Sequence, residues 1–157
     1  MEVKTMPEVK NYLKIEDQIN HELSGDVQKN ALDFVAFLRT NDLSPESNEQ
    51  HDGWNIFCRE KIIVFSKVIG DENVFAIVLN NCNFDGDLAD DDLREFAWAR
   101  VVFCPKGCGG TTICKMSQKR RTIFGKDFEH ICVAPYEFFN LDADELKKAQ
   151  KLILMLK

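Results

Sequence analysis

The sequence predicts an α+β fold, in which an antiparallel sheet of three to five strands carries N- and C-terminal helices mainly on one face. Two helical segments come first, three closely spaced strand segments follow, and the chain closes with a helical segment. Short connections between strands are typical of antiparallel neighbours. Helices grouped before and after the strands, instead of alternating with them, are typical of α+β proteins.

The N-terminal helices are expected within residues 1–40. The first falls within residues 7–23, where apolar residues recur loosely at helical spacing. The second is clearer, because its apolar residues share one face: Val27, Ala31, Phe34, Val35 and Leu38. Ser24 or Asp26 is expected to cap this helix. It should end near Thr40, before a polar loop over residues 43–52.

Residues 53–101 are expected to form the sheet and one more helix. Three strands are predicted, at residues 54–58, 61–68 and 74–79. Residues 70–73 have the composition of a hairpin turn between the last two. A helix is predicted over residues 90–101, since three aspartates at its start favour the positive end of the helix dipole.

The last third of the chain contains an irregular Cys- and Gly-rich loop, residues 102–134, and a C-terminal helix, residues 142–157. Residues 128–133 read either as a final strand or as the wall of a loop. Asp142 and Glu145 have the spacing of a capping box at the start of the helix. A single domain over residues 1–157 is expected, because neither side of the 43–52 loop would have a partner surface for its apolar face.

Composition and charge exclude several classes of protein. The chain has 157 residues, of which 45% are hydrophobic and 29% charged, the profile of a globular protein. Its net charge of −6 argues against nucleic acid and anionic membranes as partners. No apolar run resembles a signal peptide or is long enough to span a bilayer. A cytoplasmic location is therefore expected, where thiols stay reduced.

The cysteine-rich segment is the most informative feature for function. Cys104, Cys108 and Cys114 lie close together among glycines, and Cys132 follows beside His130. Glycine lets the backbone fold closely around an ion, and four soft thiolates suit tetrahedral zinc. We therefore expect these four cysteines to bind zinc, with His130 as a substitute for Cys132. Four protein ligands leave no open position, so the role of the zinc would be structural.

Two other interpretations of these cysteines remain open. Free cysteines are often simply buried as small apolar residues, and Cys58 and Cys82 are expected to be core residues of this kind. Alternatively, Cys104 and Cys108 would form a thiol-redox pair, with Lys106 lowering the pKa of a thiolate. Their spacing differs from that of the thioredoxin-like motif, which has two intervening residues.

An acidic loop partly matches a calcium-binding loop. Oxygen-bearing side chains occupy the expected positions, with Gly86 between them: Asn81, Asn83, Asp85, Asp87 and Asp92. The first position is Asn instead of Asp, the last is Asp instead of the bidentate Glu, and the loop follows a strand instead of a helix. The alternative is a solvated loop leading into a helix N-terminus.

Basic residues cluster once in the chain, and they offer a candidate anion-binding site: Lys115, Lys119, Arg120, Arg121 and Lys126. The alternative is a solvated loop that balances an acidic protein.

Neither a Ser-His-Asp order nor a nucleophile elbow is present, and His21 and His51 are expected to face solvent. Trp54 and Trp98 are expected in the core. An enzyme is therefore not the expected function.

Several segments resemble the YdhG-like group of small bacterial proteins. They are residues 31–38, the strand start at 54–57, the paired strands up to Leu79, and residues 122–128 with the helix after them. The resemblance implies a compact α+β domain of largely unknown function. Some relatives are described as frataxin-like iron carriers, which implies that the acidic loop would bind iron through its carboxylates: Asp85, Asp87, Asp90, Asp91 and Asp92.

The sequence thus favours a non-enzymatic binding or accessory domain with a structural zinc site between Cys104 and Cys132. Its partner would be another protein or a small molecule. The two alternatives are an iron carrier that uses the acidic 81–92 loop and a thiol-redox protein that uses Cys104 and Cys108.

Overall fold

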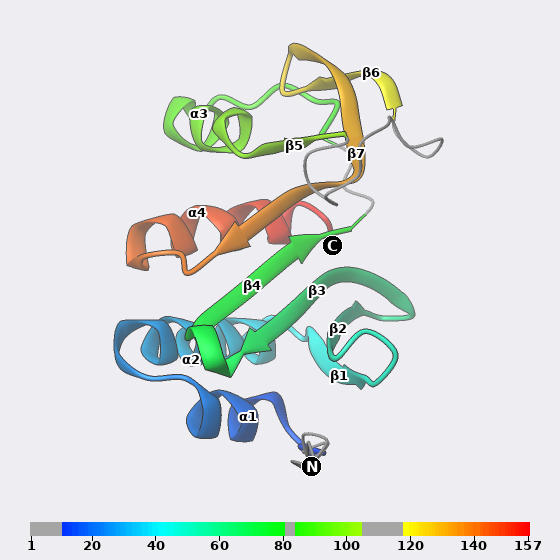
Figure 1. Cartoon of the computed structure of the whole chain (residues 1–157). Coiled ribbons are helices and arrows are strands. Elements are labelled where there is room, and N and C mark those ends of the chain that lie inside the picture. The colour runs from blue at the N-terminus through cyan, green and yellow to red at the C-terminus, as the bar shows by residue number, and fades with distance from the viewer. Residues whose placement is uncertain (1–10, 81–83, 105–117) are drawn as a thin grey trace, which may run out of the picture.

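The computed structural model describes residues 11–80, 84–104 and 118–157, without the side chains of residues 118, 119 and 133–135 (Figure 1). The described helices are α1 (Ile15–Glu22), α2 (Gly25–Thr40), α3 (Asp91–Ala99), α4 (Ala143–Leu154) and a 3-10 turn, η1 (Gly70–Glu72). The strands are β1 (Ser44–Asn48), β2 (Gly53–Cys58), β3 (Lys61–Ile69), β4 (Val74–Leu79), β5 (Val101–Phe103), β6 (Gln118–Ile123) and β7 (Lys126–Phe139). The fold is α+β, with helices packed on an antiparallel sheet.

All the described strands belong to one sheet, in the order β1-β2-β3-β4-β7-β5, with β6 also paired to β7. The long strand β7 joins its two halves. Tyr136 pairs with Leu79 of β4 and with Val101 of β5, so these two strands flank β7 on opposite sides. Ile131 likewise lies between β5 and β6. Strands β4 and β6 therefore pair with successive stretches of the same edge of β7.

The prediction of three to five strands was too low, because the described sheet has seven. The three predicted strands are confirmed as β2, β3 and β4. Strand β1 lies within residues 43–52, which were expected to be a loop. It is an edge strand that carries Pro45 and Glu46 and has no buried residue, so it shows no apolar alternation. Strand β6 and most of β5 lie within residues 102–134, which were expected to be an irregular loop, so that prediction was wrong for these stretches.

Strand β7 extends well beyond the predicted 128–133. Its second half contains Pro135, and proline inside an apolar run argues against a strand in sequence-based reasoning. In the structure, Pro135 follows the stretch that pairs with β6 and precedes the stretch that pairs with β4. None of the described strands has a residue paired with Pro135 itself, so a missing N–H is tolerated there.

The ends of two helices have well-defined hydrogen bonds. The predicted capping box of α4 is confirmed, since Asp142 accepts from the backbone of Asp144 and Glu145, and Glu145 accepts from the backbone of Asp142. Helix α2 ends in a Schellman motif, in which the N–H of Leu43 donates to the carbonyl of Leu38 at 2.9 Å. The left-handed position of that motif is held by Asp42, with φ of 56°.

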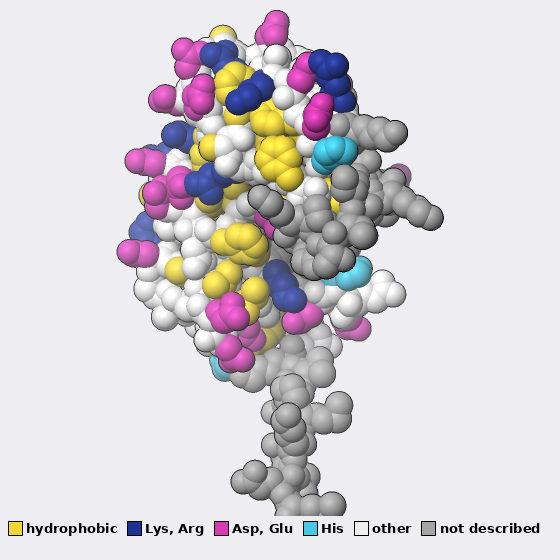
Figure 2. Space-filling view, turned by 45° about the horizontal axis from the view of Figure 1, so that its top comes forward, with side chains coloured by type: hydrophobic (Ala, Val, Ile, Leu, Met, Phe, Trp, Pro, Cys, Tyr) yellow, Lys and Arg dark blue, Asp and Glu magenta, His cyan; other side chains and the backbone are white. Residues whose placement is uncertain are grey.

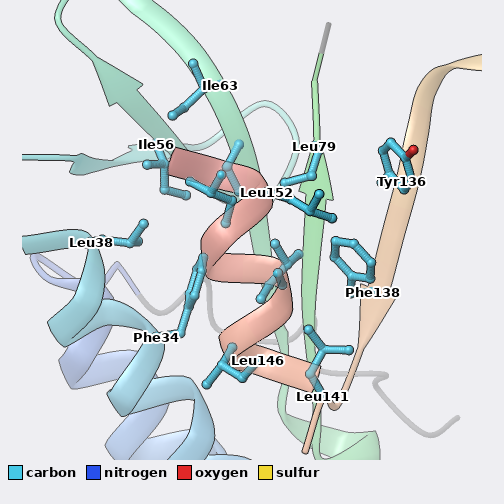
Figure 3. Packing of buried hydrophobic residues seen from close by; sticks show 14 of the residues in the cluster. Phe34, Leu38, Ile56, Ile63, Leu79, Tyr136, Phe138, Leu141, Leu146 and Leu152 are labelled. Carbon is cyan, nitrogen blue, oxygen red and sulfur yellow. The ribbon is translucent and has the colours of Figure 1, made fainter. Parts of the chain in front are cut away.

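The core lies between the sheet and the helices. In Figure 1, α2 lies behind β3 and β4, and α4 lies behind the second half of β7. Figure 3 shows Phe34 and Leu38 of α2 and Leu152 of α4 pointing toward the strands, and Tyr136 and Phe138 of β7 approach the same space. Phe34, Leu38 and Phe138 are fully buried. No described helix is both long and apolar enough to cross a membrane.

The opposite face of the sheet carries partly exposed side chains. One row of paired residues crosses it, from β7 to β1: Glu137, Val78, Phe65, Asn55 and Glu46. Phe139 lies two residues beyond Glu137 and is 56% exposed. The ring of Phe65 covers Gly53, where a Cβ would collide with it. Glu137 is half-buried in this row, and burial raises its pKa above the usual value of a glutamate.

Replacing Glu137 with glutamine is expected to raise the free energy of unfolding at pH 7. A carboxyl whose pKa is raised in the folded state destabilises the fold when it is ionised, and the neutral amide does not. The advantage of the variant should shrink as the pH falls from the raised pKa to the ordinary glutamate value, and vanish below it. Urea unfolding of both proteins at several pH values measures this. A carboxyl resonance of Glu137 that titrates at or below the ordinary value would contradict it.

Candidate functional site

Strands β5 and β7 bring Cys104 beside His130. Phe103 pairs with Ile131, and the backbone N–H of the next residue, Cys104, donates to the carbonyl of His130 at 2.7 Å. Cys132 lies on the other side of the Phe103–Ile131 pair. Two cysteines that are far apart in the sequence therefore lie on the same ladder, one on each side of a single residue pair. Both are half-buried, whereas His130 is exposed.

The backbone of β7 is distorted at this place. His130 has φ of 54°, in the left-handed region that residues other than glycine rarely adopt. The register between β5 and β7 also shifts between the pairs Val101–Tyr136 and Phe103–Ile131. Irregularities of this kind re-aim side chains and are frequent beside functional sites. They lie directly beside Cys104 and Cys132.

The other predicted zinc ligands, Cys108 and Cys114, lie outside the described residues. Among the residues that are described, no three His, Cys, Asp or Glu side chains are grouped so that they could hold a metal ion. Cys104, His130 and Cys132 therefore do not form a metal site by themselves. The predicted redox pair is not described either, because it needs Cys108. Cys58 packs against the core as expected, and Cys82 is outside the described residues.

The carboxylates of the predicted acidic loop do not act together in the structure, because they have different partners. Asp90 caps α3 by accepting from the N–H of Leu93, and this hydrogen bond, helped by Lys151, lowers the pKa of Asp90. Asp91 pairs with Arg94. The remaining described carboxylates of the loop, Asp85, Asp87 and Asp92, are exposed, and Asn81 and Asn83 lie outside the described residues. Two of the five carboxylates proposed for iron are thus engaged in holding α3.

The basic residues of the predicted anion site lie partly on the β6–β7 hairpin. Arg120 pairs with Asp127, which also accepts from Thr122 Oγ1 at 2.6 Å. These two interactions, that of Thr122 first, lower the pKa of Asp127. Arg121 lies opposite Phe128 in the ladder. The hairpin therefore balances part of its own positive charge. Lys115 and the side chain of Lys119 are outside the described part of the chain.

Aromatic rings with Lys and Arg side chains stacked over them lie beside this hairpin, and no sequence motif predicted this cluster. Lys126 Nζ lies 5.1 Å from the ring centre of Trp98 and 5.4 Å from that of Phe128, and Arg94 also lies over Trp98. Figure 2 shows hydrophobic and basic side chains together at this end of the molecule. Trp98 is half-buried and donates to the carbonyl of Ile123 at 2.8 Å. It fastens α3 to the hairpin.

Other sequence predictions for aromatic and histidine residues are confirmed. Trp54 is a core residue, 4% exposed, and its indole N–H donates to Gln18 at 2.8 Å. His21 and His51 are exposed. His51 lies between β1 and β2, which β3 and β4 separate from β7 and β5 in the sheet order.

A cavity of about 640 Å³ lies at the other end of the sheet, between the β2–β3 turn, the end of α2 and the end of α4. Charged side chains line it, among them Arg59, Lys61 and Lys157. Sequence reasoning did not find it, because its walls come from three separate parts of the chain. The one local signal is the two-residue turn Arg59-Glu60, which contains none of the Gly or Asn residues usual in such turns.

No protein-family model matches this chain, and no match was found among curated proteins or solved structures. The resemblance to the YdhG-like group therefore stays a prediction, and so does the iron-carrier function that it implies. The candidate sites are argued only from the geometry and chemistry of this chain.

Proposed function

We propose that this chain is a binding or accessory domain in which the segment from Cys104 to Cys132 holds a structural zinc ion. The observation that carries the proposal is the β5–β7 ladder, which puts Cys104 and Cys132 on either side of one residue pair. The other two ligands would be Cys108 and Cys114, from the segment between β5 and β6. His130 is the substitute ligand for Cys132.

The spacing of the two cysteines suits a bridging ion. Diagonal neighbours on one face of a regular antiparallel pair have Cβ atoms about 7–8 Å apart or slightly less. That is too far for a disulfide, which needs a Cβ–Cβ distance of about 3.5–4.5 Å. Zinc bound by thiolates at about 2.3 Å spans most of this gap. In a regular ladder such a pair would therefore suit zinc better than a disulfide, and the register shift and the left-handed His130 alter the spacing at Cys104 and Cys132.

A zinc ion at this position would also stabilise the end of a short strand. Strand β5 has only three residues, and its described pairing with β7 ends beside Cys104. Short edge strands contribute few hydrogen bonds, so their ends open easily. Zinc would fix the end of β5 and the start of the following segment to β7. This would hold a surface at one end of the sheet in a single arrangement, which an accessory domain needs for a partner.

Elemental analysis tests the proposal directly. Protein purified without added metal or chelator is expected to contain about one zinc per chain, since one four-ligand site holds one ion. Cys104→Ala and Cys132→Ala should both lose most of the zinc. Cys58→Ala is the matched control, because Cys58 lies on β2, away from the candidate site. It should keep the zinc content of the wild type.

His130→Ala decides between the two ligand sets. Zinc retained in this variant and lost in Cys132→Ala identifies Cys132 as the ligand, and the reverse identifies His130. The proposal is wrong if the purified wild type holds no metal and all its thiols react freely, or if it holds iron that survives loss of the cysteines. A reversible disulfide at Cys104 without metal would favour the redox alternative instead.

A further inference from the structure

The cavity beside the β2–β3 turn is separate from the candidate zinc segment. It has a volume of about 640 Å³, within the range of about 300–1,000 Å³ that is usual for small-molecule sites. Strand β4 lies between β3, on which part of the cavity is built, and β7, which carries Cys132. The two sites can therefore be tested independently.

The floor of the cavity is apolar. Ile63 is 1% exposed, and Leu156 and Cys58 are half-buried. Ile63 lies where the register between β2 and β3 shifts by one residue, next to the pair Phe57–Ile62. A bulge at this point directs the side chain of the extra residue out of the regular alternation. Ile63 thereby reaches both the core and the cavity.

The rim of the cavity is charged and mostly unpaired. Three cations, Arg59, Lys61 and Lys157, face two carboxylates, Asp42 and Glu60. Lys157 donates to the carbonyl of Asn41 at 2.8 Å and so closes the gap between the ends of α4 and α2. Among the described residues, the other four make no salt bridge. The side chains of the lining thus comprise three cations and two carboxylates.

Arg59 occupies a backbone position at which glycine would be more stable. It is the first residue of the two-residue turn between Cys58 and Lys61, and its φ is 57°. Such turn positions favour Gly, Asn or Asp, because a larger side chain is strained at positive φ. The turn makes the guanidinium part of the cavity rim, where no described residue forms an ion pair with it. Its five N–H donors in a planar fork suit a carboxylate.

We propose that this cavity binds a small organic carboxylate with an apolar body. The carboxylate would lie at Arg59 and Lys61, and the apolar body would cover the half-buried Leu156 and Cys58. The guanidinium of Arg59 and the ammonium of Lys61 both favour a negatively charged group at this side of the cavity. A dianion would be less suitable, because Asp42 and Glu60 border the same space. Burial of the apolar body supplies affinity, and the charged rim selects the sign of the ligand.

Three probes of one shape test the sign of the ligand: 4-phenylbutyrate, 4-phenylbutanol and 4-phenylbutylamine. Each is titrated into the full chain labelled with ¹⁵N, and the backbone amide shifts give the affinity and the place of binding. The carboxylate is expected to bind about ten-fold more tightly than the alcohol, the size of one charge-assisted hydrogen bond. The amine should bind most weakly. The shifts should centre on residues 58–61 and on the end of α4.

Two variants are expected to change the affinity in opposite directions. Arg59→Gly should weaken 4-phenylbutyrate binding about ten-fold, because it removes the main donor. Asp42→Gly should strengthen it about two- to three-fold, because it removes a carboxylate from the rim of a solvent-open site. Both changes put glycine at a left-handed position. Both variants should therefore melt at or above the temperature of the wild type, which separates lost binding from lost folding.

Several outcomes would overturn the proposal. They are tighter binding of the amine than of the carboxylate, unchanged carboxylate affinity in Arg59→Gly, or no shift at residues 58–61 with any of the three probes. If Arg59→Gly tightened the binding of 4-phenylbutylamine and Asp42→Gly weakened it, the cavity would be a cation site. None of these results bears on the zinc segment, which is tested by metal content.

Discussion

Phe138→Ala is expected to lower the free energy of unfolding by about 3–5 kcal/mol, the range for aromatic-to-alanine changes in a close-packed core. Phe138 is fully buried. Its ring stacks on Phe96 of α3, with 5.6 Å between centroids, and on Tyr136, with 6.1 Å. The guanidinium of Arg100, which pairs with Glu145 of α4, lies 5.9 Å from the ring centre of Phe138. One side chain therefore connects α3, α4 and the sheet.

The neighbouring residue supplies the control for this prediction. Phe139 belongs to the same strand but points to the opposite face, where it is 56% exposed and pairs with Ala76. Phe139→Ala should change the free energy of unfolding by no more than about 0.5 kcal/mol. Urea unfolding followed by circular dichroism measures both. Similar losses in the two variants would mean that the two faces of β7 are packed alike, contrary to the fold described.

Removal of zinc is expected to have the second large effect. Binding to the folded state alone adds its free energy to the stability of that state. We expect a strong chelator to lower the free energy of unfolding by about 3 kcal/mol or more, and the melting temperature by roughly 6–12 °C. The loss should be local first, since the hydrogen bonds of β5 and β6 lie beside the site, whereas those of α2 and β3 do not.

Hydrogen exchange with and without chelator locates this effect. Faster exchange in β5 and in the first half of β7, with α2 and β3 unchanged until global unfolding, is the expected pattern. Cys132→Ala is the matched control, because a protein that has lost its zinc should not respond to the chelator. A chelator that destabilises Cys132→Ala as much as the wild type acts elsewhere, and such a result would remove the case for zinc in this segment.

Elements with strong hydrophobic periodicity were predictable from the sequence. The apolar face of α2, the continuous apolar run of β4 and the capping box of α4 each identify an element without knowledge of its neighbours. These signals are local because side-chain burial in a helix or a central strand repeats at a fixed interval. Their boundaries in the structure differ from those predicted by a few residues at most where both are described.

Strands that depend on a partner were not predictable in the same way. Strand β1 has the sequence Ser-Pro-Glu-Ser-Asn, and only its ladder with β2 makes it a strand. Strand β6 is mainly basic and polar and is held by its ladder with β7. An edge strand need not bury either face, so its sequence lacks the alternation that reveals a half-buried strand. Its hydrogen-bonding partner determines its conformation.

The candidate sites also differ in how far they could be predicted from the sequence. Composition alone singled out the cysteine-rich segment, because several cysteines among glycines are unusual in an ordinary loop. The adjacency of Cys104 and Cys132 came only from the β5–β7 ladder. The cavity at Arg59 had no sequence motif at all, because its lining comes from a helix end, a strand turn and the last residues described.

The sequence by itself determined the α+β class, the central strands and the main helices of this protein, because these follow from local periodicity and capping. Tertiary structure decided which strands form the edges, how β7 joins the two halves of the sheet, and where charged side chains meet an apolar floor. The physical reason is that pairing and cavity formation depend on contacts between residues far apart in the chain.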